Sequence, residues 1–177
     1  MRLRLRPRLR LARRPGKIFA LDPQQQNRSA RVSDIEAPAA RVIAAYKSAV
    51  AARDTAAFMR LYDPAVRVFD AWGVWSHEGV AAWQVAVEGW FASHPADRLT
   101  VSFDDVRSVA TPAFTSVSAI VTYAVVSAQG VPINAMQNRL SWVLKTSGHV
   151  LRIVHEHTSA PVGFEDGKAI LQRPGKP

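Results

Sequence analysis

The sequence predicts an α+β domain in which about three N-terminal helices pack on one antiparallel sheet. Between residues 35 and 91, apolar side chains recur at spacings of three and four, which is the period of amphipathic helices. From Leu99 onward, apolar side chains alternate with polar ones, which is the period of half-buried strands. Helices that are followed by strands, rather than interleaved with them, indicate the α+β class.

The first helix is predicted to begin between Ile35 and Pro38. Proline suits the first turn of a helix, and Ser33 or Asp34 can cap the free amides. Tyr46 falls on the apolar face of this helix.

A short second helix is predicted after Asp54, which can cap it, and Asp63-Pro64 is expected to end it. Residues 66–70 then alternate as a strand and lead into a loop rich in indole side chains. The next helix carries apolar residues at spacings of three and four: Val80, Trp83, Val87, Trp90 and Phe91.

The last two strands are predicted to form a hairpin, because apolar and β-branched runs flank the turn residues Thr146-Ser147-Gly148. Strict alternation places four residues on one face of the final strand: Leu151, Ile153, His155 and His157. A polar end on an apolar face is typical of a pocket wall, so both histidines are predicted to face a pocket.

An earlier strand, over residues 113–127, is apolar on both faces between Ile120 and Val126. A sheet with helices on one side exposes its other side, so two apolar faces indicate a second covering layer. We therefore expect a homodimer in which a second copy covers the outer face.

The composition excludes several classes of protein. The 177 residues contain no cysteine, so the chain has no disulfide, thiolate metal site or cysteine nucleophile. No apolar run reaches the roughly 18 residues that a membrane-spanning helix needs, and we expect a cytoplasmic protein. No glycine-rich phosphate loop and no serine on a nucleophile elbow is present, and we expect no cofactor.

The net charge of +9 lies in an N-terminal tail. Ten of the 23 basic residues and one of the 14 acidic residues fall within residues 1–31, and the rest of the chain is neutral. We predict a basic disordered tail over residues 1–33, or a wrongly assigned start of the chain, then a folded domain over 34–164 and a polar extension over 165–177. Nucleic acid is expected to bind only weakly, through the tail, if it binds.

The most specific motif lies between Trp142 and Pro161. It contains a tryptophan strand, a glycine turn, Arg152-Ile153-Val154, and then His155-x-His157-x-Ser159-Ala160-Pro161. Together with Leu61-Tyr62-Asp63-Pro64, this motif resembles the SnoaL-like and nuclear-transport-factor-2-like superfamily, which includes ketosteroid isomerase and the calcium/calmodulin-dependent kinase association domain. The resemblance covers about Ile35 to Phe164. It implies a cone in which helices close one side of a strongly curved sheet around a cavity, and a dimer formed through the outer face.

The isomerase branch carries a catalytic tyrosine on the first helix and an aspartate base after the first strand. The resemblance places these roles at Tyr46 and Asp70, and Asp70-Ala71-Trp72-Gly73 resembles the turn that follows the base. The same branch uses a protonated carboxylic acid beside the tyrosine. The corresponding strand here, residues 134–141, contains no acid and has Arg139 as its ionisable group.

Each candidate residue has two interpretations. Asp70 is either a general base or an acceptor of loop amide hydrogen bonds. Tyr46 either donates its phenol to a developing oxyanion or packs in the core. Arg139 either clamps a ligand carboxylate or pairs with Glu156 or Asp70 across strands.

The histidines and aromatic residues complete the predicted site. His155 is a candidate proton carrier and His157 a candidate ligand contact. Their spacing can chelate a metal, but no third ligand is evident in the sequence, so no metal is expected. Four aromatic residues are predicted to contact the ligand: Tyr62, Trp72, Trp83 and Trp90. The alternative for each of them is packing in the core or in the dimer interface.

Two functions stay open at the level of the sequence. The first is an isomerase or lyase that moves protons by isomerisation, cyclisation or dehydration of a small apolar carbonyl compound, with Asp70 as base and Tyr46 stabilising the enolate. The second is a non-catalytic domain that binds a small apolar or carboxylate-bearing ligand, or that assembles subunits.

Overall fold

A computed structural model describes residues 39–148 and 150–174 of the chain. The predicted tail, the predicted start of the first helix and the last three residues lie outside the described residues. A first helix covers residues 39–52, and the elements that follow it are α2 (Thr55–Met59), β1 (Tyr62–Phe69), β2 (His77–Glu78), α3 (Val80–Ala92), β3 (Arg98–Ala110), β4 (Phe114–Val126), β5 (Pro132–Ser147) and β6 (Val150–Ser159).

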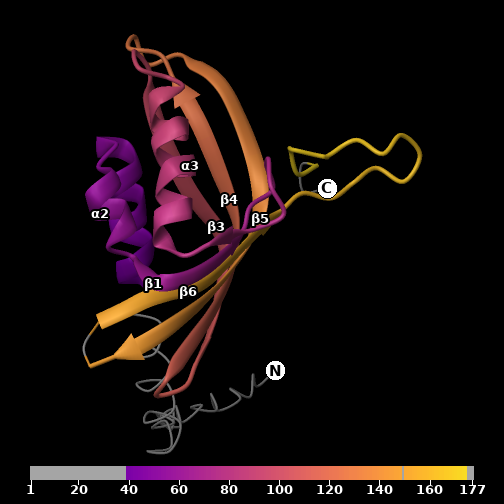
Figure 1. Ribbon diagram of the computed structural model, residues 1–177. Helices are drawn as coiled ribbons and strands as arrows, with labels where there is room; N and C mark the ends of the chain where they lie inside the picture. Colours follow the sequence, from indigo (N-terminus) through magenta and orange to yellow (C-terminus); the bar gives the residue numbers. More distant parts are fainter. Residues whose placement is uncertain (1–38, 149, 175–177) are drawn as a thin grey trace, which may run out of the picture.

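The strands form one sheet in the order β2-β1-β6-β5-β4-β3. Neighbouring strands are antiparallel except β1 and β6, which pair in parallel and so join the first long strand to the last. The sheet curves around α3, and the helices lie on its concave side (Figure 1). The predicted α+β class and the strongly curved, mainly antiparallel sheet are confirmed, whereas the parallel β1–β6 pair was not anticipated.

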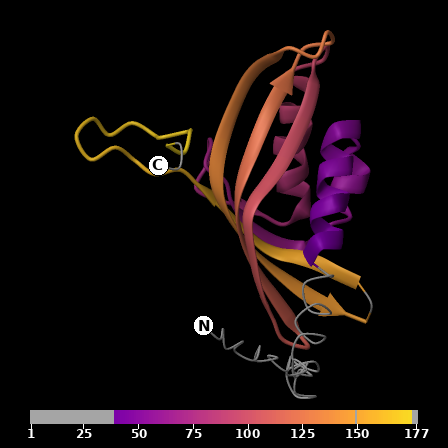
Figure 2. The same ribbon diagram turned by 180° about the vertical axis from the view of Figure 1, so that it is seen from behind.

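The hydrophobic core lies between the helices and the concave face of the sheet. Its largest fully buried side chains include Tyr46, Phe58, Tyr62, Leu140, Trp142, Leu144 and Ile153. Seen from behind, the convex face of β3, β4 and β5 has no described helix over it (Figure 2). The expected homodimer through this face stays a prediction.

The α2 helix begins as predicted but ends sooner. The Asp54 carboxylate accepts a hydrogen bond of 2.8 Å from the Ala57 amide, so Asp54 is the N-cap. The prediction that Asp63-Pro64 ends this helix was wrong, because α2 stops at Met59 and both residues lie in β1. The pairing of β1 with β6 is irregular between Tyr62 and Arg67, and an irregular stretch tolerates a proline, which has no amide hydrogen to donate.

The C-terminal end of the first helix is fixed by Arg53. Its backbone is left-handed, with φ of 51°, and its guanidinium donates to the carbonyls of His94, Pro95 and Asp97 in the connection between α3 and β3. The amide of Asp54 reaches back 3.0 Å to a carbonyl of the last helical turn, as in helices that end in a left-handed residue. One side chain therefore ties the first helix to the end of α3.

The C-terminal segment projects from the body of the domain and returns to β5 (Figure 1). Val162 and Ala169 form an isolated bridge, and the Gln137 amide of β5 donates to the Leu171 carbonyl at 2.7 Å. This segment therefore occupies the edge of β5 beyond the end of β6. Across the described ranges, no helix combines the length and apolar character needed to cross a bilayer.

Substitution can separate the two contributions of Arg53, which are its guanidinium hydrogen bonds and its left-handed backbone. Arg53→Ala removes the guanidinium and keeps the unfavourable left-handed backbone, so we expect it to lower the free energy of unfolding by about 2 kcal/mol. Arg53→Gly also loses the guanidinium but relieves the backbone, so it should be about 1 kcal/mol more stable than Arg53→Ala. Urea unfolding measures both, with the exposed Lys47→Ala on the same helix as control. Equal stabilities of the two variants would contradict this account.

Candidate functional site

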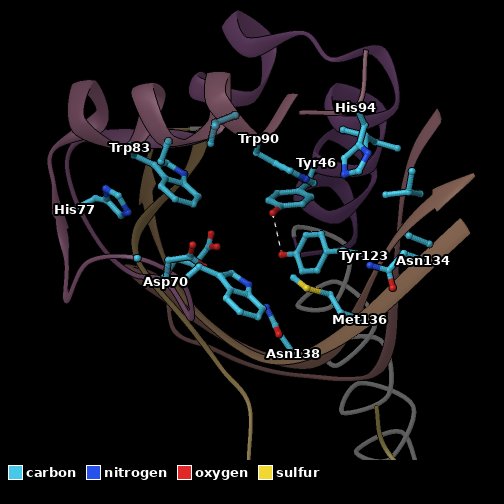
Figure 3. Close-up of a pocket in the computed structure, with 18 of the residues that line it drawn as sticks. Tyr46, Asp70, His77, Trp83, Trp90, His94, Tyr123, Asn134, Met136 and Asn138 are labelled. Carbon is cyan, nitrogen blue, oxygen red and sulfur yellow. Dashed lines mark hydrogen bonds between the residues drawn. The ribbon is translucent and has the colours of Figure 1, made fainter. Parts of the chain in front are cut away.

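A cavity of about 510 Å³ lies between α3 and the concave face of the sheet. Figure 3 shows Trp83 and Trp90 reaching from α3 toward the sheet, with Asp70, Met136 and Asn138 on the opposite side. The aromatic lining residues are Tyr46, Trp72, Trp83, Trp90 and Tyr123, together with the rings of His77 and His94. The polar or ionisable groups besides these are Asp70, Asn134, Asn138 and Glu156.

The structure brings five of the predicted site residues to this one cavity: Tyr46, Asp70, Trp72, Trp83 and Trp90. Tyr62 is buried behind the cavity wall. Its hydroxyl donates to Glu156, which lines the cavity, and Tyr62 itself does not line it. Arg139, His155 and His157 are not part of the described lining. The phenol and carboxylate that the sequence singled out therefore face the same space, but the predicted cation and histidines do not.

The cavity contains an acid that the sequence analysis did not assign to it, Glu156 of β6. Its side chain is 1 % exposed, and its Oε2 atom accepts hydrogen bonds from the Tyr62 hydroxyl at 2.7 Å and from the Trp142 indole at 2.9 Å. Burial, and to a lesser degree the nearby charge of Asp70, raise the pKa of Glu156 to about 7, although its two donors act in the opposite direction. Glu156 is therefore partly protonated at neutral pH.

A β-bulge at Val154 explains why Glu156 faces inward. Val143 of β5 pairs with His155 and Leu144 pairs with Ile153, so Val154 has no partner of its own. An extra residue reverses the alternation of side chains along the rest of the strand. Ile153 before the bulge and Glu156 after it consequently both point into the domain.

The prediction that His155 and His157 lie on the same face as Ile153 was therefore wrong, because it assumed unbroken alternation. His157 instead lines a second, neighbouring pocket, together with Asp70 and Trp72. Both rings pack edge-on against Phe69, at centroid distances of 5.1 and 5.8 Å. His155 Nδ1 lies 2.9 Å from the Arg67 carbonyl and can donate to it. These histidines lie on the opposite face of β6 from the buried Glu156.

The predicted placement of Arg139 at the ligand was also wrong. Along β5, Asn138, Leu140 and Trp142 are buried on the concave face, whereas Arg139 lies between two of them and is exposed. No ion pair joins Arg139 to Asp70 or Glu156 among the described residues. Regular alternation counted from Trp142 would have given this result.

Asp70 follows β1 and is held by Thr158 of β6. The Asp70 Oδ1 atom accepts hydrogen bonds of 2.8 Å from both the Thr158 hydroxyl and the Ala71 amide. Thr158 lies two residues beyond Glu156 on the same buried face, and Val68 of β1 is paired with Glu156. The parallel β1–β6 pairing thus places the Asp70 and Glu156 carboxyl groups on neighbouring strands of one cavity wall.

Two tyrosines occupy another part of the cavity. The hydroxyls of Tyr46 and Tyr123 are 3.1 Å apart and share a hydrogen bond, drawn as a dashed line in Figure 3. Burial is the main reason why the pKa of each phenol lies well above its ordinary value. Both phenols stay protonated near neutral pH, so this pair can offer one hydrogen-bond donor to a ligand.

A family profile described as the SnoaL-like domain matches residues 40–163, which is most of the chain. The chain belongs to the SnoaL-like domain family. Among curated proteins, no sequence matches it.

Solved structures similar to this SnoaL-like domain share its fold at low sequence identity. An NTF2-like protein of unknown function from Pseudomonas putida has a TM-score of 0.68 and 19 % identity, covering 82 % of this chain and 98 % of its own. Aln2 from a Streptomyces species has a TM-score of 0.66 and 16 % identity, covering 71 % and 90 %. A putative calcium/calmodulin-dependent protein kinase II association domain from Xanthomonas campestris has a TM-score of 0.57 and 15 % identity, covering 70 % and 85 %. The resemblance to the SnoaL-like family is confirmed by the family profile, and the solved structures show that the fold is the NTF2-like one.

The raised pKa of Glu156 makes the stability of this SnoaL-like domain depend on pH. The folded protein holds the Glu156 proton more tightly than the unfolded chain does, so stability is highest below the ordinary glutamate pKa of 4.5 and falls as pH rises through about 7. We expect the contribution of Glu156 to lower Tm by roughly 5 °C between pH 5 and pH 8.

Glu156→Gln isolates this contribution, because the amide oxygen can still accept from Tyr62 and Trp142 but the side chain does not titrate. We expect the fall in Tm over this range to be clearly smaller in Glu156→Gln than in the wild type. Calorimetry at a series of pH values measures it, with the exposed Glu88→Gln as control. Parallel Tm curves for wild type and Glu156→Gln would contradict a raised pKa at Glu156.

Proposed function

We propose that this domain binds a small, largely apolar carbonyl compound and catalyses proton transfer on it, by isomerisation, cyclisation or dehydration. The observation that carries the proposal is the pair of carboxyl groups, Asp70 and Glu156, on one aromatic-lined cavity. Two acids in different surroundings are the usual basis for separate acid and base roles. Asp70 is partly exposed and Glu156 is buried.

The proposed step begins with Asp70 as the base. Its carboxylate removes a proton from the carbon next to the ligand carbonyl, and the electron pair of that C–H bond moves to form an enolate. Glu156 donates its proton to the developing oxyanion. Because Oε2 already accepts two hydrogen bonds, the proton belongs on Oε1, for which the described residues supply no donor. The Asp70 proton then passes to another carbon, the C=O bond re-forms, and the enol O–H proton returns to Glu156, which completes an isomerisation and restores both acids.

Tyr46 and Tyr123 support the same step from the other side of the cavity. Their shared hydrogen bond leaves one hydroxyl hydrogen available to a ligand oxygen. A neutral donor in a desolvated site stabilises negative charge more strongly than the same donor does in water. The phenol pair is thus a second possible donor to the enolate.

A non-catalytic binding role is the second candidate, and the hydrogen bonds that hold one oxygen of Asp70 favour it. Asp70 Oδ1 already accepts two hydrogen bonds, and the Tyr46 hydroxyl already has a partner. Groups satisfied in this way are typical of a static wall as well as of a resting active site. Binding of a carbonyl compound without proton exchange would support this second function.

Exchange of carbon-bound hydrogen for solvent deuterium distinguishes the two candidates. With hydroxytetralone as the probe, we expect the wild type to accelerate exchange next to the carbonyl, as followed by mass spectrometry. Asp70→Asn should reduce the rate by at least 100-fold, because it removes the base and leaves the shape unchanged. The exposed Asp105→Asn, outside the cavity, is the matched control. If wild type and Asp70→Asn exchange at the same rate, the catalytic proposal fails.

A further inference from the structure

The second pocket adjoins the cavity at Asp70. It has a volume of about 480 Å³, and its lining combines aromatic side chains with three polar or ionisable residues, Asp70, His157 and Thr158. Asp70 lines the cavity as well as this pocket. The proposed base therefore forms part of the boundary between the two spaces.

The pairing of β1 with β6 places His157 beside Asp70. Phe69, the last residue of β1, is paired with His157, and Asp70 follows Phe69 directly. Paired strands lie about 4.8 Å apart and rise about 3.3 Å per residue, so the Cα atoms of Asp70 and His157 are about 6 Å apart. The Phe69 ring packs edge-on against the His157 ring and restricts the directions that the imidazole can take.

The Asp70 carboxylate and the His157 ring lie on opposite sides of their strands. Asp70 accepts from Thr158 on the inner face of β6, whereas His157 is on the outer face. Because β1 ends at Phe69, the second pocket joins the two sides around that end. Its volume has room for several water molecules, each of which occupies about 30 Å³ in the liquid. A short chain of water can thus connect the carboxylate to the ring.

One oxygen atom of Asp70 is available to this path. The Oδ1 atom accepts from the Thr158 hydroxyl and the Ala71 amide, whereas no hydrogen bond to Oδ2 is present among the described residues. A ligand that fills the cavity covers Asp70 on that side. The second pocket offers a proton on Oδ2 a route to the solvent that does not pass the ligand.

His157 suits this route better than His155 does. An imidazole ring can accept a proton on one nitrogen and release a proton from the other. His157 lines the second pocket and is also exposed to solvent. His155 does not line this pocket, and its Nδ1 atom is occupied by the Arg67 carbonyl. Of the two histidines that pack against Phe69, His157 is the one that connects Asp70 with the solvent.

We propose that His157 is a proton-relay residue, which carries protons between Asp70 and the solvent through the second pocket. The inference rests on the proposed function, because Asp70 must act as a base for a proton to be carried. Asp70 gives its proton to a water molecule in the pocket, and this water gives one of its own to the free ring nitrogen of His157. The ring then releases a proton from its other nitrogen, which leaves Asp70 ionised and His157 neutral. In deuterated water, the reverse sequence delivers a deuteron to Asp70.

Deuterium exchange into hydroxytetralone tests the relay, because each exchange requires Asp70 to lose a proton to the solvent and to gain a deuteron. We expect His157→Ala to lower the protein-catalysed rate at least about tenfold, since the abstracted proton then returns to the ligand before it is replaced. His155→Ala removes the other histidine that packs against Phe69 and is the matched control. It should keep the wild-type rate.

Imidazole added to the buffer distinguishes proton transfer from a structural role of His157. Removal of the ring leaves space in the second pocket, so free imidazole should restore most of the rate that His157→Ala loses, after subtraction of the exchange that it causes without protein. The wild type and His155→Ala should not respond. A loss that imidazole does not restore would show that His157 is only structural.

The same experiment separates the relay from the proposed function. Equal exchange rates for wild type and His157→Ala would overturn the relay and leave Asp70 as the base. A wild type that does not exchange at all would overturn the proposed function, and the relay with it.

Discussion

The β-bulge at Val154 is the local feature on which the candidate site depends. Without it, regular alternation would turn Glu156 and Thr158 to the convex face while Ile153 stayed in the core. With it, Ile153 packs in the core and both polar residues point inward. Glu156 thereby meets its donors, and Thr158 meets Asp70. One inserted residue therefore places Glu156 and Thr158, instead of His155 and His157, on the inner face of β6.

The polar wall is unfavourable for folding and is maintained by packing around it. Tyr62 and Trp142 are both fully buried, and each directs a donor to Glu156. Their hydrogen bonds offset only part of the desolvation of the acid, since its pKa is still raised. On the same wall, the Oδ1 atom of Asn138 has no hydrogen-bond partner among the described residues. Polar groups that destabilise a free protein are characteristic of functional sites, where binding or catalysis depends on them.

The sequence predicted the fold and about half of the site, for reasons that individual residues make clear. Tyr46 and Asp70 were placed by helix and strand order, which a local irregularity does not alter. His155 and Glu156 were exchanged between faces, because no sequence signal marks a bulge and a shift of one residue inverts everything after it. The inward position of Asn138 and the outward position of Arg139 both follow from the alternation counted back from Trp142.

The protonation state of Glu156 tests the central claim most directly, because it depends on the bulge, the burial and the two donors together. Infrared difference spectroscopy during a pH titration detects the carbonyl stretch of a protonated carboxylic acid, and Glu156→Gln identifies its source. The account predicts a protonated-acid band that disappears with a midpoint near pH 7 and is absent in Glu156→Gln. The account would be contradicted if the Glu156 band disappeared near pH 4.5, the ordinary glutamate pKa, or if no Glu156 band were present above that pH.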